Sequence, residues 1–215
     1  MESARRFFMT DSDIKFIIYT DSDLEFSGND WIKIRIEHEP WPAPTLKRFH
    51  YFLKASKEIL ESDLSFYIDV DSVFIKEIKY SDFDFNDFNG FNEMVGTVHP
   101  GFDGTIGTPE RNPLSQAYIG IPEKNIYYCG GFFGGASNKF ISVSKDISEK
   151  IDTDLDNEIM PIWHDESHLN RYFFNNPPKI TLANQFASSE NKIFETTKIV
   201  FLDKTAIGGY DFFRN

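Results

Sequence analysis

The chain has 215 residues and a formal net charge of −12, because 34 acidic side chains outnumber 22 basic ones. Hydrophobic residues make up 40% and aromatic residues 16% of the chain, which excludes a disordered or low-complexity protein. The acidic balance argues against nucleic acid or an anionic membrane surface as the main partner. One cysteine, Cys129, excludes an intrachain disulfide and a multi-thiolate metal site.

No stretch of the sequence approaches the roughly 20 apolar residues that cross a bilayer. The first residues are too charged for a signal peptide. We therefore expect a soluble, cytoplasmic protein without a membrane segment, and a bacterial or viral origin stays open.

Strands and helices are predicted to alternate along the chain. The expected strands are rich in β-branched and aromatic residues and are bounded by turn residues; they lie at 14–20, 31–36, 64–69, 94–98 and near 198–201. Apolar residues recur at helical spacing in three segments: 45–62, 138–151 and 165–174. A Gly- and Pro-rich loop is expected over 101–113. The alternation predicts an α/β fold with a mixed, mainly parallel sheet, in a single domain over residues 1–215.

The first chemical motif is Asp69-Val70-Asp71, which follows a predicted buried strand. Side chains two residues apart point to the same side of an extended chain, so Asp69 and Asp71 are expected to converge. Paired carboxylates repel each other unless a cation or a proton lies between them, and hard oxygen ligands suit Mg²⁺ or Mn²⁺ bridging to a phosphate. A solvated acidic turn is the alternative reading of this short pattern.

The second motif is the segment 163–170, in which His164 and His168 lie four residues apart on a predicted helix. The spacing resembles the zinc-protease arrangement, but Glu166 stands one residue too late for the general base of that motif. The alternative is a helix start at which Asp165 and Glu166 interact favourably with the helix dipole. Carboxylates in this position are candidates for a nucleophile or a general base.

The third motif is the glycine-rich segment 129–135, flanked by Tyr127 and Tyr128. Glycines allow the backbone to approach a ligand or another strand closely. The pattern fits the wall of a small pocket and the tight packing of strands equally well.

Taken together, five ordered segments resemble the family-six glycosyltransferases, the group that holds the histo-blood-group A and B transferases and the α1,3-galactosyltransferases. The matching segments are 67–74, 99–102, 115–119, 127–135 and 163–170. The resemblance runs from about residue 4 to about residue 179. It implies a GT-A-type, Rossmann-like nucleotide-sugar transferase fold. It also implies a retaining, metal-dependent transfer of N-acetylgalactosamine (GalNAc) or galactose from a UDP-sugar to a galactoside acceptor, with an α1,3 linkage.

The same resemblance implies the roles of single residues. Glu166 is implied as the nucleophile or as the stabiliser of an oxocarbenium-like state. Mn²⁺, with Mg²⁺ as the alternative, would be held by Asp69 and Asp71. The implied donor-binding residues are Arg48, Asp69, Val70, Asp71, Cys129, Gly130, Gly131 and Asp165. The implied acceptor-binding residues are His99, Thr108, Trp163 and Glu166.

Selectivity and the C-terminal region carry further expectations. Cys129 and Gly131 match the pair that reads the substituent at C2 of the donor sugar, and their small size favours UDP-GalNAc over UDP-galactose. Beyond Lys179 the chain diverges from the family, and there Lys204 is expected to serve the diphosphate and Glu190 the acceptor.

Family members carry a strand upstream of the helix with which this chain begins, and that strand holds part of the uracil pocket. We therefore expect the first strand of the family to be lacking. This makes a non-catalytic carbohydrate- or nucleotide-binding remnant the alternative to an active transferase. A metal-dependent hydrolase that uses Asp69, Asp71 and His164 is a third reading.

Overall fold

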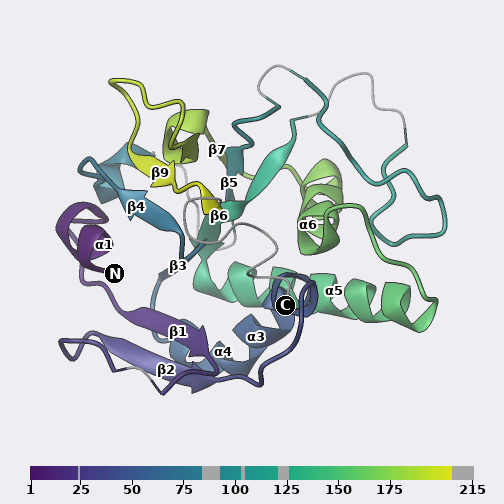
Figure 1. Ribbon diagram of the computed structural model, residues 1–215, viewed down its shortest axis with the longest axis horizontal. Helices are drawn as coiled ribbons and strands as arrows, with labels where there is room; N and C mark the ends of the chain where they lie inside the picture. The colour runs from purple at the N-terminus through teal and green to yellow at the C-terminus, as the bar shows by residue number, and fades with distance from the viewer. Residues whose placement is uncertain (24, 84–92, 103–104, 121–125, 205–215) are drawn as a thin grey trace.

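The computed structural model describes residues 1–23, 25–83, 93–102, 105–120 and 126–204 (Figure 1). The helices are α1 (Glu2–Phe7), α2 (Ala43–Leu46), α3 (Arg48–Lys54), α4 (Ser56–Ile59), α5 (Ser137–Asp156) and α6 (His164–Asn175), with short 3₁₀ turns at Tyr80–Phe83 and Asn184–Phe186. The strands are β1 (Phe16–Thr20), β2 (Trp31–Arg35), β3 (Leu64–Ile68), β4 (Ser72–Phe74), β5 (Met94–Val98), β6 (Tyr128–Ala136), β7 (Ile180–Leu182), β8 (Ser188–Ser189) and β9 (Ile199–Phe201). Within the ranges above, no helix combines the length and the apolar character that crossing a bilayer requires.

The described strands form a central four-stranded sheet and two smaller sheets. The central sheet has the order β3-β6-β5-β7, β1 pairs with β2, and the third sheet has the order β4-β9-β8. The pairs β1–β2, β5–β7 and β8–β9 are parallel, while β3–β6, β5–β6 and β4–β9 are antiparallel. The expectation of a mixed α/β fold is confirmed, but parallel pairs do not outnumber antiparallel ones in the part of the chain that the structure describes.

The strand β6 was not predicted, although it pairs on both sides within the central sheet. Strand propensities do not indicate a strand in this segment, because it is rich in glycine, which is depleted in strands. Two of them are required by close packing. A Cβ atom at Gly134 would lie 2.4 Å from the carbonyl oxygen of Ser65, and one at Gly135 would lie 2.3 Å from that of Glu93. Tight strand packing therefore accounts for this end of the glycine-rich segment.

The predicted helix over 45–62 is instead three short helices, α2, α3 and α4. The backbone leaves helical dihedral angles at Lys47 (ψ 11°) and Ala55 (ψ 23°), so the segment is interrupted twice. The apolar spacing places Leu46, Phe49, Leu53 and Leu60 on one face, and this is only half confirmed. Leu46 and Phe49 are almost fully buried, but Leu53 is partly buried and Leu60 is 53% exposed, because the two interruptions change the direction of the chain. The predicted helices over 138–151 and 165–174 are confirmed as α5 and α6, each slightly longer than expected.

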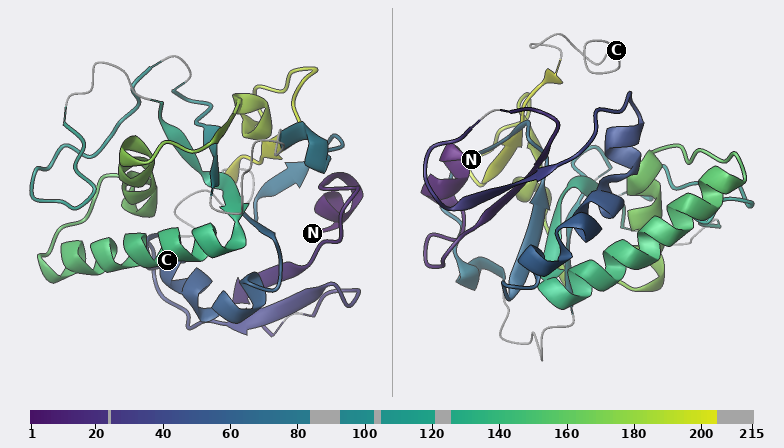
Figure 2. Two further views of the ribbon diagram at one scale, coloured as in Figure 1. Left: turned by 180° about the vertical axis from the view of Figure 1, so that it is seen from behind. Right: turned by 90° about the horizontal axis from the view of Figure 1, so that it is seen from below.

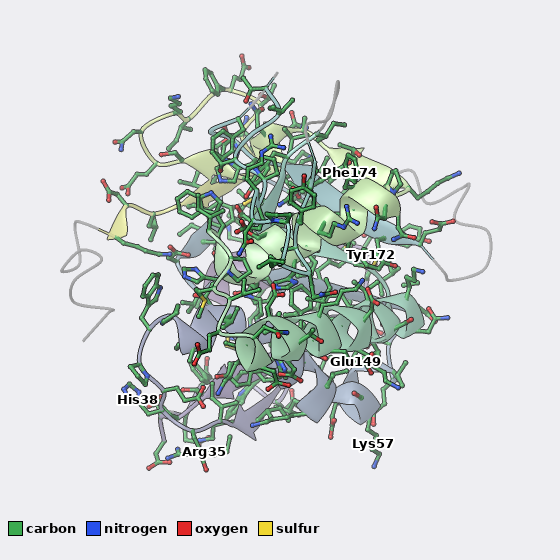
Figure 3. All side chains as sticks on the ribbon, turned by 90° about the vertical axis from the view of Figure 1, so that its right-hand side faces the viewer. Arg35, His38, Lys57, Glu149, Tyr172 and Phe174 are labelled. Carbon is green, nitrogen blue, oxygen red and sulfur yellow. The ribbon has the colours of Figure 1, made fainter. Side chains whose placement is uncertain are left out.

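Two hydrophobic clusters cover the two faces of the central sheet. On β6, the neighbouring side chains of Phe132 and Phe133 point to opposite faces and belong to different clusters. The cluster of Phe133 lies against α3, α5 and α6, and Figure 3 shows α5, with Glu149, beside α6, with Tyr172. The cluster of Phe132 lies against α1 and the strands β4 and β9. Figure 2 shows these layers from two further sides.

Strands β1 and β3 share both clusters but do not pair with each other in the described residues. Ile17 of β1 and Tyr67 of β3 pack against the cluster on the helical face, and Phe16 and Phe66 of the same strands pack against the other one. The two strands therefore run in one layer, between the same two clusters. Each is paired along one edge only, β1 with β2 and β3 with β6.

Candidate active site

Three chain segments that carry the sequence motifs meet where β3 ends and β6 begins. The segment that follows β3 is joined to β6, since the backbone N–H of Asp69 donates to the carbonyl oxygen of Gly131 (3.0 Å). Helix α6 is joined to the start of β6 by Asn170. Its amide oxygen accepts from the N–H of Tyr128 (2.8 Å), and its amide nitrogen donates to the carbonyl oxygens of Tyr128 and Glu166 (both 2.9 Å). These bonds bring the start of α6 against Gly130.

Arg48, the first residue of α3, lies at the centre of the site. Its guanidinium is 3.3 Å from Asp165 and 3.5 Å from Asp69, donates to the carbonyl oxygen of Gly130, and lies 4.3 Å from the centre of the Tyr67 ring. Burial opposes the positive charge of Arg48, but Asp165, Tyr67 and Asp69 outweigh it and raise its pKa. Arg48 is therefore a fixed cation between two motifs that lie far apart in the sequence.

Two acids stand on the first turn of α6, the buried Asp165 and the partly buried Glu166. The Glu166 carboxylate accepts from the N–H of Gly130 (2.8 Å). Burial raises the pKa of Glu166 to about 7, although the Gly130 N–H and the Tyr127 hydroxyl favour the charged form. Burial, together with the nearby charge of Asp69, raises the pKa of Asp165 to about 6 against the opposing effect of Arg48. Both acids thus titrate near neutral pH.

The Asp69-Val70-Asp71 turn connects β3 to β4 and gives its two acids different partners. Asp69 accepts a hydrogen bond from the Tyr67 hydroxyl (2.5 Å) and faces Arg48. Asp71 pairs with Lys204, whose ammonium nitrogen is 3.0 Å from its Oδ2 atom. Val70, at the tip of the turn, is fully exposed. The two carboxylates are thus held by different cations at the same turn.

Two carboxylate oxygens of the site are buried and have no hydrogen-bond partner, namely Oδ1 of Asp71 and Oδ1 of Asp165. An unpaired buried acceptor costs about 1–3 kcal/mol, and more when it is charged. Such groups are expected where a ligand completes the hydrogen bonds. Their place near Asp69 and Arg48 makes this region a candidate binding site.

The acids of the turn fit a hard divalent cation. Among the described residues, no three His, Cys, Asp or Glu side chains are grouped so that they could hold a metal ion by themselves. Mg²⁺ and similar ions, however, are usually bound by one or two carboxylates together with substrate phosphates and water. Asp69, and Asp71 with its unpartnered Oδ1 atom, provide those two carboxylates.

The two histidines of the second motif do not face a common point. The ring of His164 packs edge-on against Trp41, with ring centroids 4.7 Å apart. His168 is buried 3.4 Å from Asp154, and burial lowers the pKa of its ring to about 4. The hypothesis of a zinc-protease pair therefore finds no support in the geometry, and neither does a hydrolase that would draw on His164.

The expected acceptor residues form a second group beside Glu166. The indole N–H of the half-exposed Trp163 donates to the Thr108 hydroxyl (2.5 Å). The ring of His99 lies 5.8 Å from that of Tyr127, and its Nδ1 atom accepts from the N–H of Gly101 (3.0 Å). Burial lowers the pKa of His99, so its ring is neutral near neutral pH.

The glycines nearest the site are constrained by its side chains. A Cβ atom at Gly130 would lie 3.2 Å from Oε2 of Glu166. One at Gly131 would lie 2.5 Å from the Phe201 ring and 3.1 Å from Oδ2 of Asp69. Cys129 is nearly buried, its sulfur accepts from the Gly131 N–H (3.3 Å), and burial raises the pKa of its thiol. Close packing therefore applies to both halves of the glycine-rich segment, against neighbouring backbone at Gly134 and Gly135 and against side chains of the site at Gly130 and Gly131.

Sequence reasoning missed several residues that hold the site together. Tyr67 and Asn170 stand inside the quoted motifs but were given no role. Glu110 is buried, and one of its carboxylate oxygens accepts from the N–H of Ile162 (2.7 Å), just before α6. Glu190, expected at the acceptor, accepts from the backbone N–H of Asp203 (2.8 Å) and so supports the segment next to Lys204.

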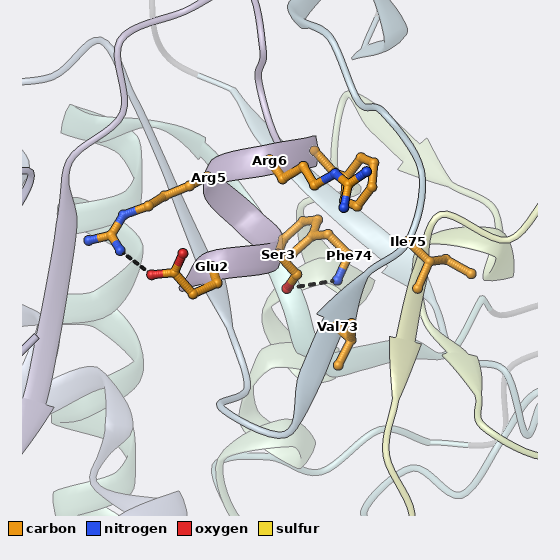
Figure 4. Close-up of a pocket in the computed structure, with 8 residues that line it drawn as sticks. Glu2, Ser3, Arg5, Arg6, Val73, Phe74 and Ile75 are labelled. Atoms are coloured by element: carbon orange, nitrogen blue, oxygen red, sulfur yellow. Dashed lines mark hydrogen bonds and ion pairs between the residues drawn. The ribbon is translucent and has the colours of Figure 1, made fainter. Parts of the chain in front are cut away.

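One hollow in the described part of the chain lies away from these motifs. It is an open groove of about 700 Å³ between α1 and β4 (Figure 4). Its lining residues are Glu2, Ser3, Arg5, Arg6, Phe7, Val73, Phe74 and Ile75. None of them belongs to the expected site.

Comparison with known proteins finds relatives that match most of the chain. A family model described as Glycosyltransferase family 6 matches residues 1–202. The O-antigen biosynthesis glycosyltransferase WbnI of Escherichia coli is 32% identical over 197 residues, which cover 88% of this chain and 81% of that protein.

Two mammalian relatives are similar over most of the chain. The histo-blood group ABO system transferase 1 of Rattus norvegicus is 28% identical, over 86% of this chain and 55% of its own length. The globoside alpha-1,3-N-acetylgalactosaminyltransferase 1 of Homo sapiens is 27% identical, over 89% of this chain and 56% of its own length. The chain therefore spans about half the length of these two relatives.

Proposed function

The chain belongs to glycosyltransferase family 6, and on that premise we propose that it is a retaining α1,3-glycosyltransferase. It would transfer GalNAc, or alternatively galactose, from a UDP-sugar to a galactoside acceptor. The observation that carries the proposal is the pair of buried, unpartnered carboxylate oxygens on Asp71 and Asp165, which flank Asp69 and Arg48. A sugar with several hydroxyl groups, joined to a diphosphate, supplies the donors and the cation-binding oxygens that such a site requires.

The donor diphosphate needs positive charge in a protein whose net charge is −12. We propose that Asp69 and Asp71 hold Mn²⁺, with Mg²⁺ as the alternative. When bound, such an ion acts as a Lewis acid that stabilises the departing diphosphate. Arg48 supplies a fixed, forked donor next to the same turn. The backbone of the exposed Val70 lies beside both acids, in the place proposed for the nucleotide.

Glu166 is proposed to stabilise the developing positive charge at the anomeric carbon, as a nucleophile or through its negative charge. Its carboxylate is oriented by the Gly130 N–H. Asp165, held by Arg48, has its second oxygen free of protein partners and is proposed to accept from a sugar hydroxyl. A buried, oriented carboxylate stabilises an oxocarbenium-like state more strongly than one in water does.

The acceptor is proposed to bind beside the Trp163–Thr108 pair and His99. A half-exposed indole ring offers a flat apolar surface for a sugar ring, and a neutral imidazole can accept or donate a hydrogen bond. Cys129 and Gly131 are proposed to read the C2 substituent of the donor sugar. Neither carries a bulky side chain that would exclude an acetamido group, so UDP-GalNAc is the expected donor; the Phe201 ring, 2.5 Å from the place of a Cβ atom at Gly131, has to shift to admit the group.

A transfer assay tests this function. The full-length chain is incubated with Mn²⁺, UDP-GalNAc or UDP-galactose, and a panel of galactosides, and the linkage and anomeric configuration of the product are determined by NMR. The expected product carries an α1,3-linked GalNAc. The variant Glu166→Gln tests the role of the carboxylate. It should lower turnover by orders of magnitude while UDP still binds.

Other outcomes of this assay decide against the proposal. A preference for UDP-galactose would overturn the donor assignment, and a β-linked product would overturn retention. UDP or glycan binding without transfer would favour a binding remnant. Release of free sugar without transfer would favour a hydrolase.

A further inference from the structure

The segment after β9 is fixed against the Asp69-Val70-Asp71 turn by backbone contacts. Phe201 pairs with Ser72 in the β4–β9 ladder, and the N–H of Leu202 donates to the carbonyl oxygen of Asp71 (2.9 Å). The N–H of Asp203 donates to the Glu190 carboxylate (2.8 Å). These contacts of residues 201–203 fix the position of the backbone from which the Lys204 side chain extends.

The side chain of Lys204 reaches the acidic turn itself. Its ammonium nitrogen is 3.0 Å from Oδ2 of Asp71, and the Asp71 side chain is only 11% exposed. The other Asp71 oxygen is buried and has no partner. Lys204 thus provides the positive charge that Asp71 needs in a largely buried position.

The neighbouring acid has a cation of its own. Asp69 faces Arg48, which also pairs with Asp165 and is itself buried. The Arg48 guanidinium lies over the Tyr67 ring and donates a hydrogen bond to the carbonyl oxygen of Gly130. These contacts hold Arg48 in place within the site. Lys204 differs, because its side chain is 36% exposed and an ammonium on a flexible stem can change partners.

We propose that Lys204 competes with the divalent cation for Asp71, so that the cation binds weakly until a nucleoside diphosphate draws the ammonium away. The inference rests on the proposed function, since it assumes that Asp71 is a metal ligand. A dication beside Asp71 repels the ammonium, whereas a diphosphate at the same turn offers it new acceptor oxygens. Binding of the cation and of the nucleotide is therefore coupled through one side chain.

The test measures Mn²⁺ alone, by electron paramagnetic resonance of the free ion, on the full-length protein without nucleotide. Lys204→Met is expected to bind Mn²⁺ about three- to tenfold more tightly than the wild type, the effect expected for loss of one partly exposed ion pair. Lys204→Arg keeps the charge and should bind like the wild type. Lys198→Met is the matched control, because Lys198 lies beside β9 and pairs with Asp82 (2.7 Å) instead.

A second titration with saturating UDP tests the coupling. The advantage of Lys204→Met should then disappear, because the wild-type ammonium no longer occupies Asp71. An advantage that persists undiminished in the presence of UDP would overturn the coupling.

Asp71→Asn separates failure of the inference from failure of the metal site. If Asp71→Asn abolishes Mn²⁺ binding but Lys204→Met leaves the affinity unchanged, competition is wrong and the proposed metal site stands. If Asp71→Asn leaves Mn²⁺ binding unchanged, the ion lies elsewhere, and both the metal site and the inference are overturned.

Discussion

Glu166 gives the sharpest prediction, because the burial of its carboxyl group makes the free energy of unfolding depend on pH. Its pKa is raised from 4.5 to about 7, chiefly by burial. The folded protein therefore holds the Glu166 proton over a pH range in which the unfolded chain has lost it. The stabilising contribution of the neutral acid is complete below about 4.5 and is lost as the pH rises through about 7. At about 1.4 kcal/mol per pKa unit, the loss is about 3–4 kcal/mol.

Glu166→Gln removes this titration and keeps a similar shape. The amide oxygen of glutamine can still accept from the Gly130 N–H, which the Glu166 carboxylate now does at 2.8 Å. At about pH 5 the variant and the wild type should differ little in their free energy of unfolding. At about pH 8 the variant should be more stable by about 3–4 kcal/mol, although it is expected to be inactive.

Urea unfolding followed by the fluorescence of Trp31, Trp41 and Trp163 measures this difference across the pH range. Glu195→Gln is the control, because Glu195 is exposed and the same change there should have a small, nearly pH-independent effect. A difference between Glu166→Gln and the wild type that stays flat from about pH 5 to about pH 8 would refute the reasoning about burial.

Three further predictions follow from the same contacts. The value of kcat/KM should rise with pH through about 7, since Glu166 must be charged to act, and a flat profile would contradict this. Gly130→Ala should lower turnover about tenfold, because its Cβ would lie 3.2 Å from Oε2 of Glu166, whereas Gly120→Ala, whose nearest neighbour in the described part of the chain is a tyrosine oxygen at 3.7 Å, should be neutral in the same assay. Asn170→Ala should lower the free energy of unfolding by about 2–4 kcal/mol, because three hydrogen bonds are lost, two of them buried, and an effect no larger than that of the exposed Asn176→Ala would contradict this.

The sequence predicted the chemical residues better than the sheet that positions them. Asp69 and Asp165 could be identified because each follows a local pattern, a buried strand that ends in acids or a helix that begins with them. The strand β6 could not, because its glycines remove the β-branched and aromatic signal that marks a strand. Only the three-dimensional structure shows why glycine is required there, because Gly134 packs against β3 and Gly130 packs against Glu166.

Local sequence patterns also could not predict the contacts that link the motifs. Arg48 and Lys204 lie far from residues 69–71 in the sequence, yet each pairs with a carboxylate of that turn. Which lysine or arginine meets which acid depends on how β9 and α3 pack around β3, and no residue spacing encodes that packing. A family resemblance supplies the role of Arg48 because the whole fold is inherited with it. Lys204 lies beyond the matched segments, so its partner had to come from the structure.

The division of charge at this turn explains why the two cations are built differently. Arg48 is surrounded by Asp165, Asp69 and the Tyr67 ring, and leaving this place would strand two acids in a buried setting. Lys204 is 36% exposed and contacts Asp71, whose carboxylate a divalent ion can satisfy once the ammonium has left. A donor substrate that brings both negative charge and a metal ion can therefore replace Lys204 but not Arg48. The fixed cation orients the site, and the exchangeable one makes the site responsive to its ligand.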